Sequence, residues 1–232
     1  MKIAVSVPNA TLPDAAVAAR RDYLESIARP GTEILMRRNP EGPDSIESEH
    51  EREWAAVNVA RALPVLAAQG ADALIPWCAN DPGVTACREL SPLPVVGPMM
   101  AACHMAAMLG NRFSWLMPLG NPGAVRAQIE GLGLGSRLAS IRSIGVPVLE
   151  LRDDLDRSRA LLEEAAAAAA EEDGADACVL GCMALFGVAP TLSAPIPMLD
   201  PAACALSLAQ DLVEMRLSHA PRAYAPRKGV LR

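Results

Sequence analysis

The chain has 232 residues, of which 51% are hydrophobic, and it carries a formal net charge of −6. This length allows one large or two small domains, each with its own core. The acidic balance argues against a nucleic-acid partner, because such proteins usually present a basic face. Aromatic residues make up only 3% of the chain, so we expect cores built from aliphatic residues and Ala-rich helices.

Short apolar runs alternate with helical periodicities along the chain. The predicted strands span residues 2–7, 32–36, 73–77, 94–97, 112–117, 146–149, 177–181 and 196–199. The predicted helices span residues 14–28, 45–69, a short segment from 82, then 99–109, 122–131, 155–172 and 202–215. This alternation indicates an α/β fold with parallel sheets and right-handed crossovers. Residues 217–232 are predicted to form an irregular tail.

One phrase occurs twice in the chain. Gly70-Ala-Asp-Ala-Leu-Ile-Pro-Trp-Cys78 corresponds to Gly174-Ala-Asp-Ala-Cys-Val-Leu-Gly-Cys182, 104 positions later. A second phrase, Ser91 to Pro98, corresponds to Ala194 to Pro201 with an offset of 103. Two matched phrases in the same order predict a duplicated unit and therefore two similar half-size domains.

Both repeated cysteines, Cys78 and Cys182, follow a predicted strand and precede a turn or helix start. Ligands bind at this edge of open α/β sheets. If the two halves face each other across a pseudo-twofold axis, the cysteines approach one cleft from opposite sides. A racemase needs that arrangement, since a base removes a proton from one face of a carbon and an acid returns a proton to the other face.

The residues after each cysteine suggest how a thiolate and an enolate are stabilised. The backbone N–H groups of Ala79, Asn80, Met183 and Ala184 are candidate donors to a developing enolate. Asp81 is predicted to cap a helix that begins at Pro82. Since a helix N-terminus lowers the pKa of a thiol, we expect a lower pKa for Cys78 than for Cys182.

The other reactive side chains are given structural roles. Four cysteines are predicted to pack in cores: Cys87, Cys103, Cys178 and Cys204. The adjacent Cys103-His104 pair has no second ligand pair at suitable spacing, so no metal site is predicted. His219 and the acidic run 171–173 are expected to be solvated. No lysine placed for a Schiff base and no Gly-rich phosphate loop is evident, so we predict no cofactor.

The cysteine spacing also bears on the compartment. The chain contains no Cys-x-x-Cys pair, and Met1 to Val7 runs directly into a strand without the features of a signal peptide. We therefore expect reduced thiols in the cytoplasm. The uncharged stretch 91–111 contains three prolines, which favours a buried strand and helix over a membrane span.

Four sets of motifs occur in a characteristic order. They are Val7-Pro8-Asn9, then Pro30-Gly-Thr32 with Gly42-Pro-Asp-Ser-Ile-Glu47, then Cys78-Ala-Asn-Asp-Pro-Gly83, and finally Leu180-Gly-Cys-Met183. With these motifs the chain resembles the aspartate/glutamate/hydantoin racemase superfamily, and within it the hydantoin and allantoin racemase branch. The tail from Leu217 to Tyr224 also resembles the end of these proteins.

The resemblance implies two flavodoxin-like domains with an active site in the cleft between them. The first would comprise residues 1–98 and 203–232, and the second residues 99–202. It also implies a cofactor-independent mechanism, a small-molecule substrate and a homo-oligomer. Carried over by position, Cys78 and Cys182 become the catalytic acid/base pair. The implied substrate contacts are Pro8, Asn9, Ala79, Asn80, Met117, Pro118, Met183 and Ala184.

Several positions depart from the family pattern toward apolar residues. Ala10 stands where the family often has Thr or Ser, Met117-Pro118 where it has a Thr pair, and Met99 near a common Glu. These departures favour a less polar substrate, such as a 5-substituted hydantoin or a related cyclic ureide or amino-acid derivative. Two alternatives are a maleate-type cis–trans isomerase, in which one cysteine adds covalently, and a non-catalytic protein that binds a small ligand. The superfamily's decarboxylases keep only one of the two cysteines, so the pair counts against that branch.

Overall fold

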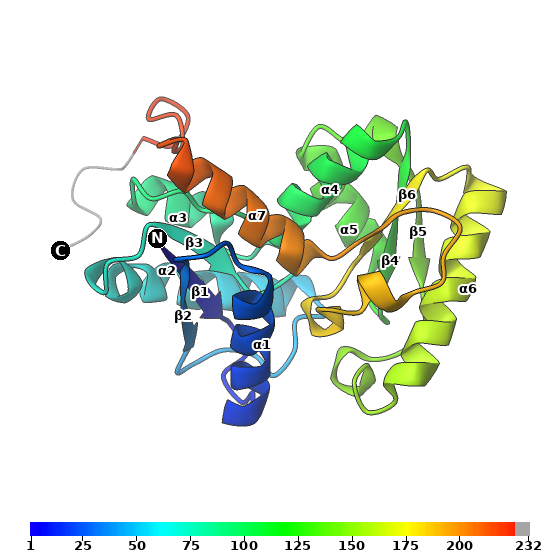
Figure 1. Ribbon diagram of the computed structural model, residues 1–232, viewed down its shortest axis with the longest axis horizontal. Helices are drawn as coiled ribbons and strands as arrows, with labels where there is room; N and C mark the ends of the chain where they lie inside the picture. The colour runs from blue at the N-terminus through cyan, green and yellow to red at the C-terminus, as the bar shows by residue number, and fades with distance from the viewer. Residues whose placement is uncertain (226–232) are drawn as a thin grey trace. The chain divides into compact units, whose positions relative to one another are not determined.

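The structure, a computed structural model, describes residues 1–225 (Figure 1). The chain forms two compact units. Unit 1 contains Met1–Ile46, His50–Pro98 and the chain from Ala205 onward, and unit 2 contains Glu47–Glu49 and Met99–Cys204. Each unit is an α/β domain with its own parallel sheet, so the predicted fold class of two parallel-sheet α/β domains is confirmed.

The sheet of unit 1 has the strand order β2-β1-β3. Its strands are β1 (Lys2–Val7), β2 (Glu33–Arg38) and β3 (Ala73–Pro76), all parallel. An isolated parallel bridge joins Leu74 to Val95 and extends the sheet beyond β3. The helices of this unit are α1 (Asp14–Ile27), α2 (Glu49–Ala68), α3 (Val84–Leu90) and most of α7 (Pro201–Glu214).

The sheet of unit 2 has the strand order β5-β4-β6-β7. Its strands are β4 (Phe113–Met117), β5 (Leu138–Ser143), β6 (Ala177–Leu180) and β7 (Met198–Leu199), again all parallel. Its helices are α4 (Pro98–Leu109), α5 (Pro122–Gly131) and α6 (Leu155–Asp173). Short 3₁₀ turns cover Gly135–Arg137, Val148–Glu150, Met183–Leu185 and Ala189–Thr191.

The two sheets repeat the same backbone pattern at the positions that the duplicated phrases predict. Leu74 bridges to Val95 in unit 1, and Cys178 pairs with Met198 in unit 2. Cys178 lies 104 positions after Leu74, and Met198 lies 103 positions after Val95. These are the offsets of the two repeated phrases. The strand order β2-β1-β3 likewise corresponds to β5-β4-β6. The predicted duplication is thus confirmed at the level of strand register.

Aliphatic and alanine side chains fill both cores, as the composition predicts. In unit 1, Val59 and Leu63 of α2 pack against Ala4 and Leu74 of the sheet. In unit 2, α6 presents buried alanines and Leu162 to Leu116. Small residues let each helix lie close to its sheet. The four cysteines that were assigned to cores are 0% to 6% exposed, which confirms that assignment: Cys87, Cys103, Cys178 and Cys204.

Three sequence-based element predictions differ from the structure. The predicted strand at 146–149 is wrong, because β5 is Leu138–Ser143 and Val148–Glu150 forms a 3₁₀ turn. The helix expected from residue 45 begins at Glu49. The strand expected at 94–97 is reduced to the single bridge at Val95. In these three places the residues that suggested a strand or a helix start lie in a connecting loop next to the observed element.

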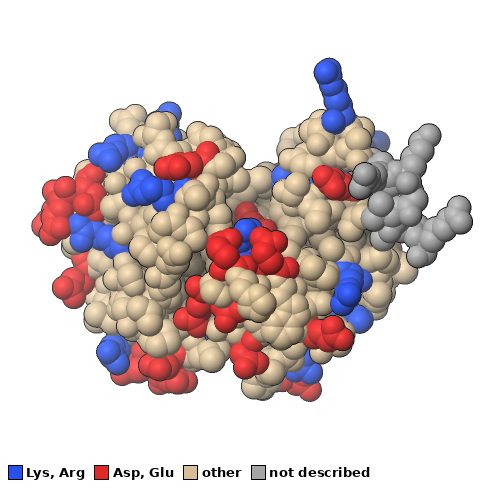
Figure 2. Space-filling view, turned by 180° about the vertical axis from the view of Figure 1, so that it is seen from behind, with Lys and Arg blue, Asp and Glu red and all other residues tan. Residues whose placement is uncertain are grey.

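Charged residues of both signs occur over the surface. On the face in Figure 2, basic side chains lie among acidic ones. None of the helices within residues 1–225 is long and apolar enough to cross a membrane.

The segment 219–224 contacts the edge of the unit 1 sheet. His219 Nε2 accepts a hydrogen bond of 2.6 Å from the backbone N–H of Val95. The ring of His219 also lies edge-on to Tyr224, with 5.5 Å between centroids. Arg88 donates to the Tyr224 hydroxyl at 3.0 Å. The expectation that His219 is solvated was therefore wrong: burial, with a smaller effect of Arg88, lowers its pKa to about 4.

We expect the contribution of His219 to stability to depend on pH. Its folded pKa of about 4 lies below the ordinary 6.5, so the unfolded chain takes up the proton first. The hydrogen bond from Val95 then stabilises the fold fully above pH ~6.5, and this contribution is lost as the pH falls toward ~4. Urea unfolding of wild type and His219→Phe should differ most at neutral pH. A difference independent of pH would contradict this assignment.

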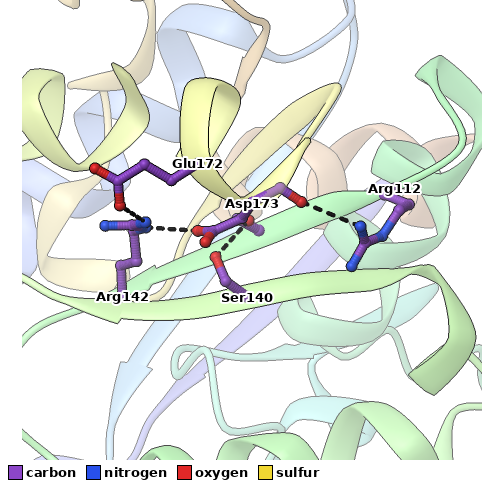
Figure 3. Close-up of polar contacts among 6 residues, drawn as sticks. Arg112, Ser140, Arg142, Glu172 and Asp173 are labelled. Carbon is purple, nitrogen blue, oxygen red and sulfur yellow. Dashed lines mark hydrogen bonds and ion pairs between the residues drawn. The ribbon is translucent and has the colours of Figure 1, made fainter. Parts of the chain in front are cut away.

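A second polar cluster lies at the end of α6 in unit 2 (Figure 3). Arg142 on β5 donates to Glu172 at 2.7 Å and to Asp173 at 2.6 Å. The Asp173 carboxylate also accepts from Ser140, and its backbone carbonyl accepts from Arg112 at 3.1 Å. The hydrogen bond from Arg142 is the main cause of a lowered pKa for Asp173. Glu171 and Glu172 are exposed, as expected for a solvated helix end, whereas Asp173 is half-buried. Glu172 and Asp173 also tie the helix end to the sheet through Arg142.

Removing the Arg142 guanidinium is expected to have a small, salt-dependent effect. The Arg142 and Asp173 side chains are 25% and 22% exposed, so solvent screens the pair. Arg142→Ala should lower the free energy of unfolding by about 1 kcal/mol at low salt, and by less at high salt. Arg126→Ala on α5 removes the same charge from an exposed site in the same unit and should have no measurable effect. Equal losses in both variants would show that the cluster contributes nothing specific.

Candidate active site

In unit 1, the predicted site residues gather at the carboxyl ends of two neighbouring strands. Cys78 lies two residues beyond the end of β3, and Pro8 and Asn9 directly follow β1. The two strands are joined past their ends, because the N–H of Trp77 donates to the carbonyl of Ser6 at 2.8 Å. The Cys78 sulfur accepts a hydrogen bond of 3.4 Å from the backbone N–H of Asn80.

In unit 2, β4 and β6 end in the same way. The N–H of Gly181 donates to the carbonyl of Leu116 at 2.6 Å, and Cys182 follows. The Cys182 sulfur accepts a hydrogen bond of 3.4 Å from the backbone N–H of Ala184. This pattern makes Met117 and Pro118 the counterparts of Val7 and Pro8. The two cysteines thus have equivalent positions after their strands. Each sulfur accepts from the N–H two residues later, at the same distance.

Two of the predicted enolate donors have a sulfur partner in the structure. The N–H groups of Asn80 and Ala184 each donate to the cysteine sulfur two residues earlier, and their role toward an enolate stays a prediction. An N–H that donates to sulfur favours the thiolate over the thiol. The structure therefore associates these two donors with the cysteines.

The two cysteines differ from the other four in exposure. Cys78 and Cys182 are partly exposed, whereas the rest are buried. Burial raises the pKa of three of the buried thiols to about 12: Cys87, Cys178 and Cys204. Thiolate chemistry in solution requires an accessible sulfur that ionises near neutral pH. The accessible cysteines are therefore the duplicated pair.

The side chains of Asn9 and Asn80 stabilise one loop of unit 1. The Asn9 amide donates to the carbonyl of Asp44 at 2.9 Å, and the Asn80 amide donates to that of Ile46 at 3.5 Å. The loop 44–46 belongs to the Gly-Pro-Asp-Ser-Ile-Glu motif, so three motifs far apart in sequence meet here. Gly42 in the same motif has φ 150°, and a Cβ there would lie 2.1 Å from the carbonyl oxygen of Pro8.

The predicted helix cap after Cys78 is wrong. Helix α3 begins at Val84 with Gly83 as its N-cap residue, and no side chain caps it. Asp81 instead has a left-handed backbone, with φ 49°. A Cβ on Gly97 would lie 2.1 Å from an Asp81 carboxylate oxygen, so this side chain lies against Gly97. The basis for a lower pKa at Cys78 is thereby removed, and the order of the two pKa values stays a prediction.

The remaining predicted contacts are apolar and mostly covered. Ala79 and Met183, directly after the cysteines, are each 3% exposed, and Met117 is 6% exposed. Met99, which was expected to make the pocket less polar, is 1% exposed. These side chains therefore act chiefly through packing beneath the strand ends.

Two residues near Cys182 were missed from the sequence. Gly181 was quoted in a motif, but its steric role is visible only in the structure, where a Cβ would lie 2.3 Å from the indole nitrogen of Trp115. Arg152 lies thirty positions before Cys182 and carries no local signal, yet its guanidinium donates to the carbonyl of Ala184 at 2.7 Å. Within residues 1–225, no three His, Cys, Asp or Glu side chains are grouped so that they could hold a metal ion.

Comparisons with known proteins agree on one family. The family model for Asp/Glu/hydantoin racemase matches residues 8–209. A hydantoin racemase of Paenarthrobacter aurescens is 31% identical over 222 residues, which cover 93% of this chain and 92% of that protein. A hydantoin racemase of Pseudomonas sp. (strain NS671) is 30% identical over 221 residues, which cover 93% and 87%. The solved allantoin racemase from Klebsiella pneumoniae superposes with a TM-score of 0.92 at 32% identity, covering 100% of this chain and 96% of that one.

Proposed function

Because this chain belongs to the Asp/Glu/hydantoin racemase family and is an isomerase of the racemase type, we propose that it inverts the α-carbon of a hydantoin-like cyclic ureide or related amino-acid derivative. Cys78 and Cys182 exchange the proton in this proposal. One observation carries it: each sulfur follows an equivalent strand and accepts one backbone N–H at 3.4 Å. Racemisation needs two groups that serve interchangeably as acid and base, and equal environments suit that exchange.

The chemical step moves one proton at each face of the carbon. A thiolate removes the proton from the α-carbon, so the C–H bond breaks and its electron pair moves into the adjacent carbonyl as an enolate. The thiol of the other cysteine then gives its proton to the opposite face of that carbon. The first cysteine ends as a thiol and the second as a thiolate, and the enantiomer is now ready for the reverse reaction.

The substrate itself provides the place for the electron pair. In a 5-substituted hydantoin the α-carbon lies between a ring carbonyl and a ring nitrogen, and the carbonyl accepts the negative charge. The reaction as proposed therefore needs no cofactor. The named activities of the hydantoin and allantoin racemase relatives support a cyclic ureide, and the apolar Ala10 supports an apolar substituent.

The test is a proton-exchange screen in deuterated buffer. Single enantiomers of 5-substituted hydantoins, allantoin, aspartate and glutamate are incubated with the enzyme. Proton NMR follows the loss of the α-proton, and polarimetry follows the loss of optical rotation. We expect both losses together for a hydantoin with an apolar 5-substituent. The double variant Cys78→Ala/Cys182→Ala corrects for spontaneous racemisation.

The other outcomes separate the alternatives. Exchange with acidic amino acids alone would contradict the substrate class. Ligand binding without exchange across the whole screen would favour a non-catalytic binding protein. A covalent adduct on one cysteine, formed with maleate and detected by mass spectrometry, would favour a cis–trans isomerase.

A further inference from the structure

Arg152 connects the start of α6 to the turn that follows Cys182. Its guanidinium donates a hydrogen bond of 2.7 Å to the carbonyl of Ala184. The guanidinium carbon also lies 4.2 Å from the centre of the Phe186 ring. A cation over an aromatic face at this distance is attracted to the ring. Arg152 therefore contacts the segment 184–186 in two ways at once.

Ala184 is held at both of its backbone groups. Its carbonyl accepts from Arg152, and its N–H donates to the Cys182 sulfur at 3.4 Å. The segment is only a short 3₁₀ turn, Met183–Leu185, so it has little hydrogen bonding of its own to stabilise it. Just beyond it, the Asp200 carboxylate accepts the N–H of Gly187 at 2.7 Å. The position of the Ala184 N–H thus depends on the charged contacts around the turn.

One positive and one negative side chain contact the backbone around this turn, Arg152 and Asp200. Arg152 is an exposed residue, and desolvation with the repulsion of Arg159 lowers its pKa below the ordinary value, but a guanidinium stays charged in proteins. Asp200 is 6% exposed and is held by two backbone N–H groups, those of Gly187 and Ala202. Arg152 is thus the positive group that directly contacts the residue donating to the Cys182 sulfur.

We propose that Arg152 is a positioning residue for the racemase reaction, which keeps the Ala184 N–H on the Cys182 sulfur and stabilises the thiolate of that cysteine. The inference rests on the proposed function of Cys182 as an acid/base. Arg152 acts through Ala184 and Phe186 and makes no contact with the substrate in this role. Its effect should therefore appear in the titration of Cys182 and leave that of Cys78 unchanged.

The experiment measures both thiols in the same protein. Wild type, Arg152→Gln and Arg152→Lys are treated with iodoacetamide from pH 6 to pH 10, and mass spectrometry of peptides gives a separate rate for each cysteine. For Arg152→Gln we expect the apparent pKa of Cys182 to rise by about half a unit, the size that a solvent-screened charge produces. Arg152→Lys keeps the charge without the planar fork and should recover part of this shift.

Arg157→Gln is the matched control. Arg157 is exposed, lies five positions along the chain, and carries the same charge. Its replacement should leave both titrations unchanged. An unchanged Cys182 pKa in Arg152→Gln would overturn the inference. Equal shifts of Cys78 and Cys182 would also overturn it, because they would indicate a general loosening of the protein.

The two hypotheses fail in different ways. If Cys182→Ala retains full racemisation, the proposed function is wrong, whatever Arg152 does. If Cys182→Ala is inactive but the apparent pKa of Cys182 is the same in Arg152→Gln as in wild type, only the proposed role of Arg152 is wrong.

Discussion

Replacement of either Cys78 or Cys182 by alanine is expected to reduce racemisation by about 10³-fold, within the range that a single acid or base contributes. Each variant retains one thiol of the proposed pair, which serves one face of the α-carbon. That thiol can still remove a proton from one enantiomer and return a solvent deuteron to the same face. We therefore expect each variant to exchange one enantiomer without inverting it, and the two variants to exchange opposite enantiomers. Chiral chromatography and NMR in deuterated buffer measure both quantities.

The control for this result is a cysteine that has no proposed chemical role. Cys87 is fully buried in α3, and its thiol has a pKa raised to about 12. Cys87→Ala should keep racemase activity within about twofold and lose about 1 kcal/mol of stability through a small cavity. Two outcomes contradict the mechanism: full racemisation in both single variants, or exchange of the same enantiomer by both.

Gly181→Ala is expected to lower the free energy of unfolding by about 3 kcal/mol, the upper part of the usual range for overpacking a core. A Cβ there would lie 2.3 Å from the indole nitrogen of Trp115 and 2.7 Å from the carbonyl oxygen of Leu116. Trp115 is 0% exposed, so its ring has no open space to enter. Urea unfolding followed by circular dichroism measures the loss. Activity should fall as well, because Cys182 is the next residue.

Gly131→Ala provides the comparison within the same unit. Gly131 is the last residue of α5, and apart from its chain neighbours and the nearby backbone of α5 no described atom lies within 4 Å of the position that a Cβ would take. Alanine favours the helix over glycine by up to ~1 kcal/mol, so this variant should be as stable as wild type or slightly more stable. If Gly181→Ala proved equally stable, the close approach of Gly181 to Trp115 would not be a constraint on this position.

The repeated phrases made the fold predictable to an unusual degree. Ala73 to Trp77 and Ala177 to Gly181 are apolar throughout, as strands buried on both faces require, and both predictions end within a residue of β3 and β6. The offset of 104 then relates the ends of β3 and β6. Because the carboxyl ends of parallel strands bind ligands, the pattern also singled out both cysteines.

The edge strand β5 was missed for a physical reason. Leu138–Ser143 pairs only with β4, and most of its residues are half-buried or exposed. An edge strand of this kind needs few apolar side chains, so its sequence contains serine and arginine. The strand was predicted instead at the more apolar residues 146–149, although Pro147 has no N–H to donate to a sheet.

The contacts of charged side chains were the least predictable part. His219 contacts Val95, 124 positions away, and Arg152 contacts Ala184, 32 positions away. Asp173 pairs with Arg142, 31 positions away. Local sequence contains no signal for partners that only the fold brings together. The misassigned cap at Asp81 has a similar cause, because the position of its side chain depends on the absence of a Cβ at Gly97.

Each of the two cysteine sulfurs accepts a hydrogen bond from a main-chain N–H. Asn80 and Ala184 donate through the main chain, so every amino acid except proline can provide that hydrogen bond. In the proposed mechanism, a change of the Ala184 side chain leaves the donor to Cys182 in place, whereas the Asn80 side chain also donates to the carbonyl of Ile46. Under the proposed mechanism, a point mutation at such a position can change the substrate preference while the backbone donor to the sulfur stays in place.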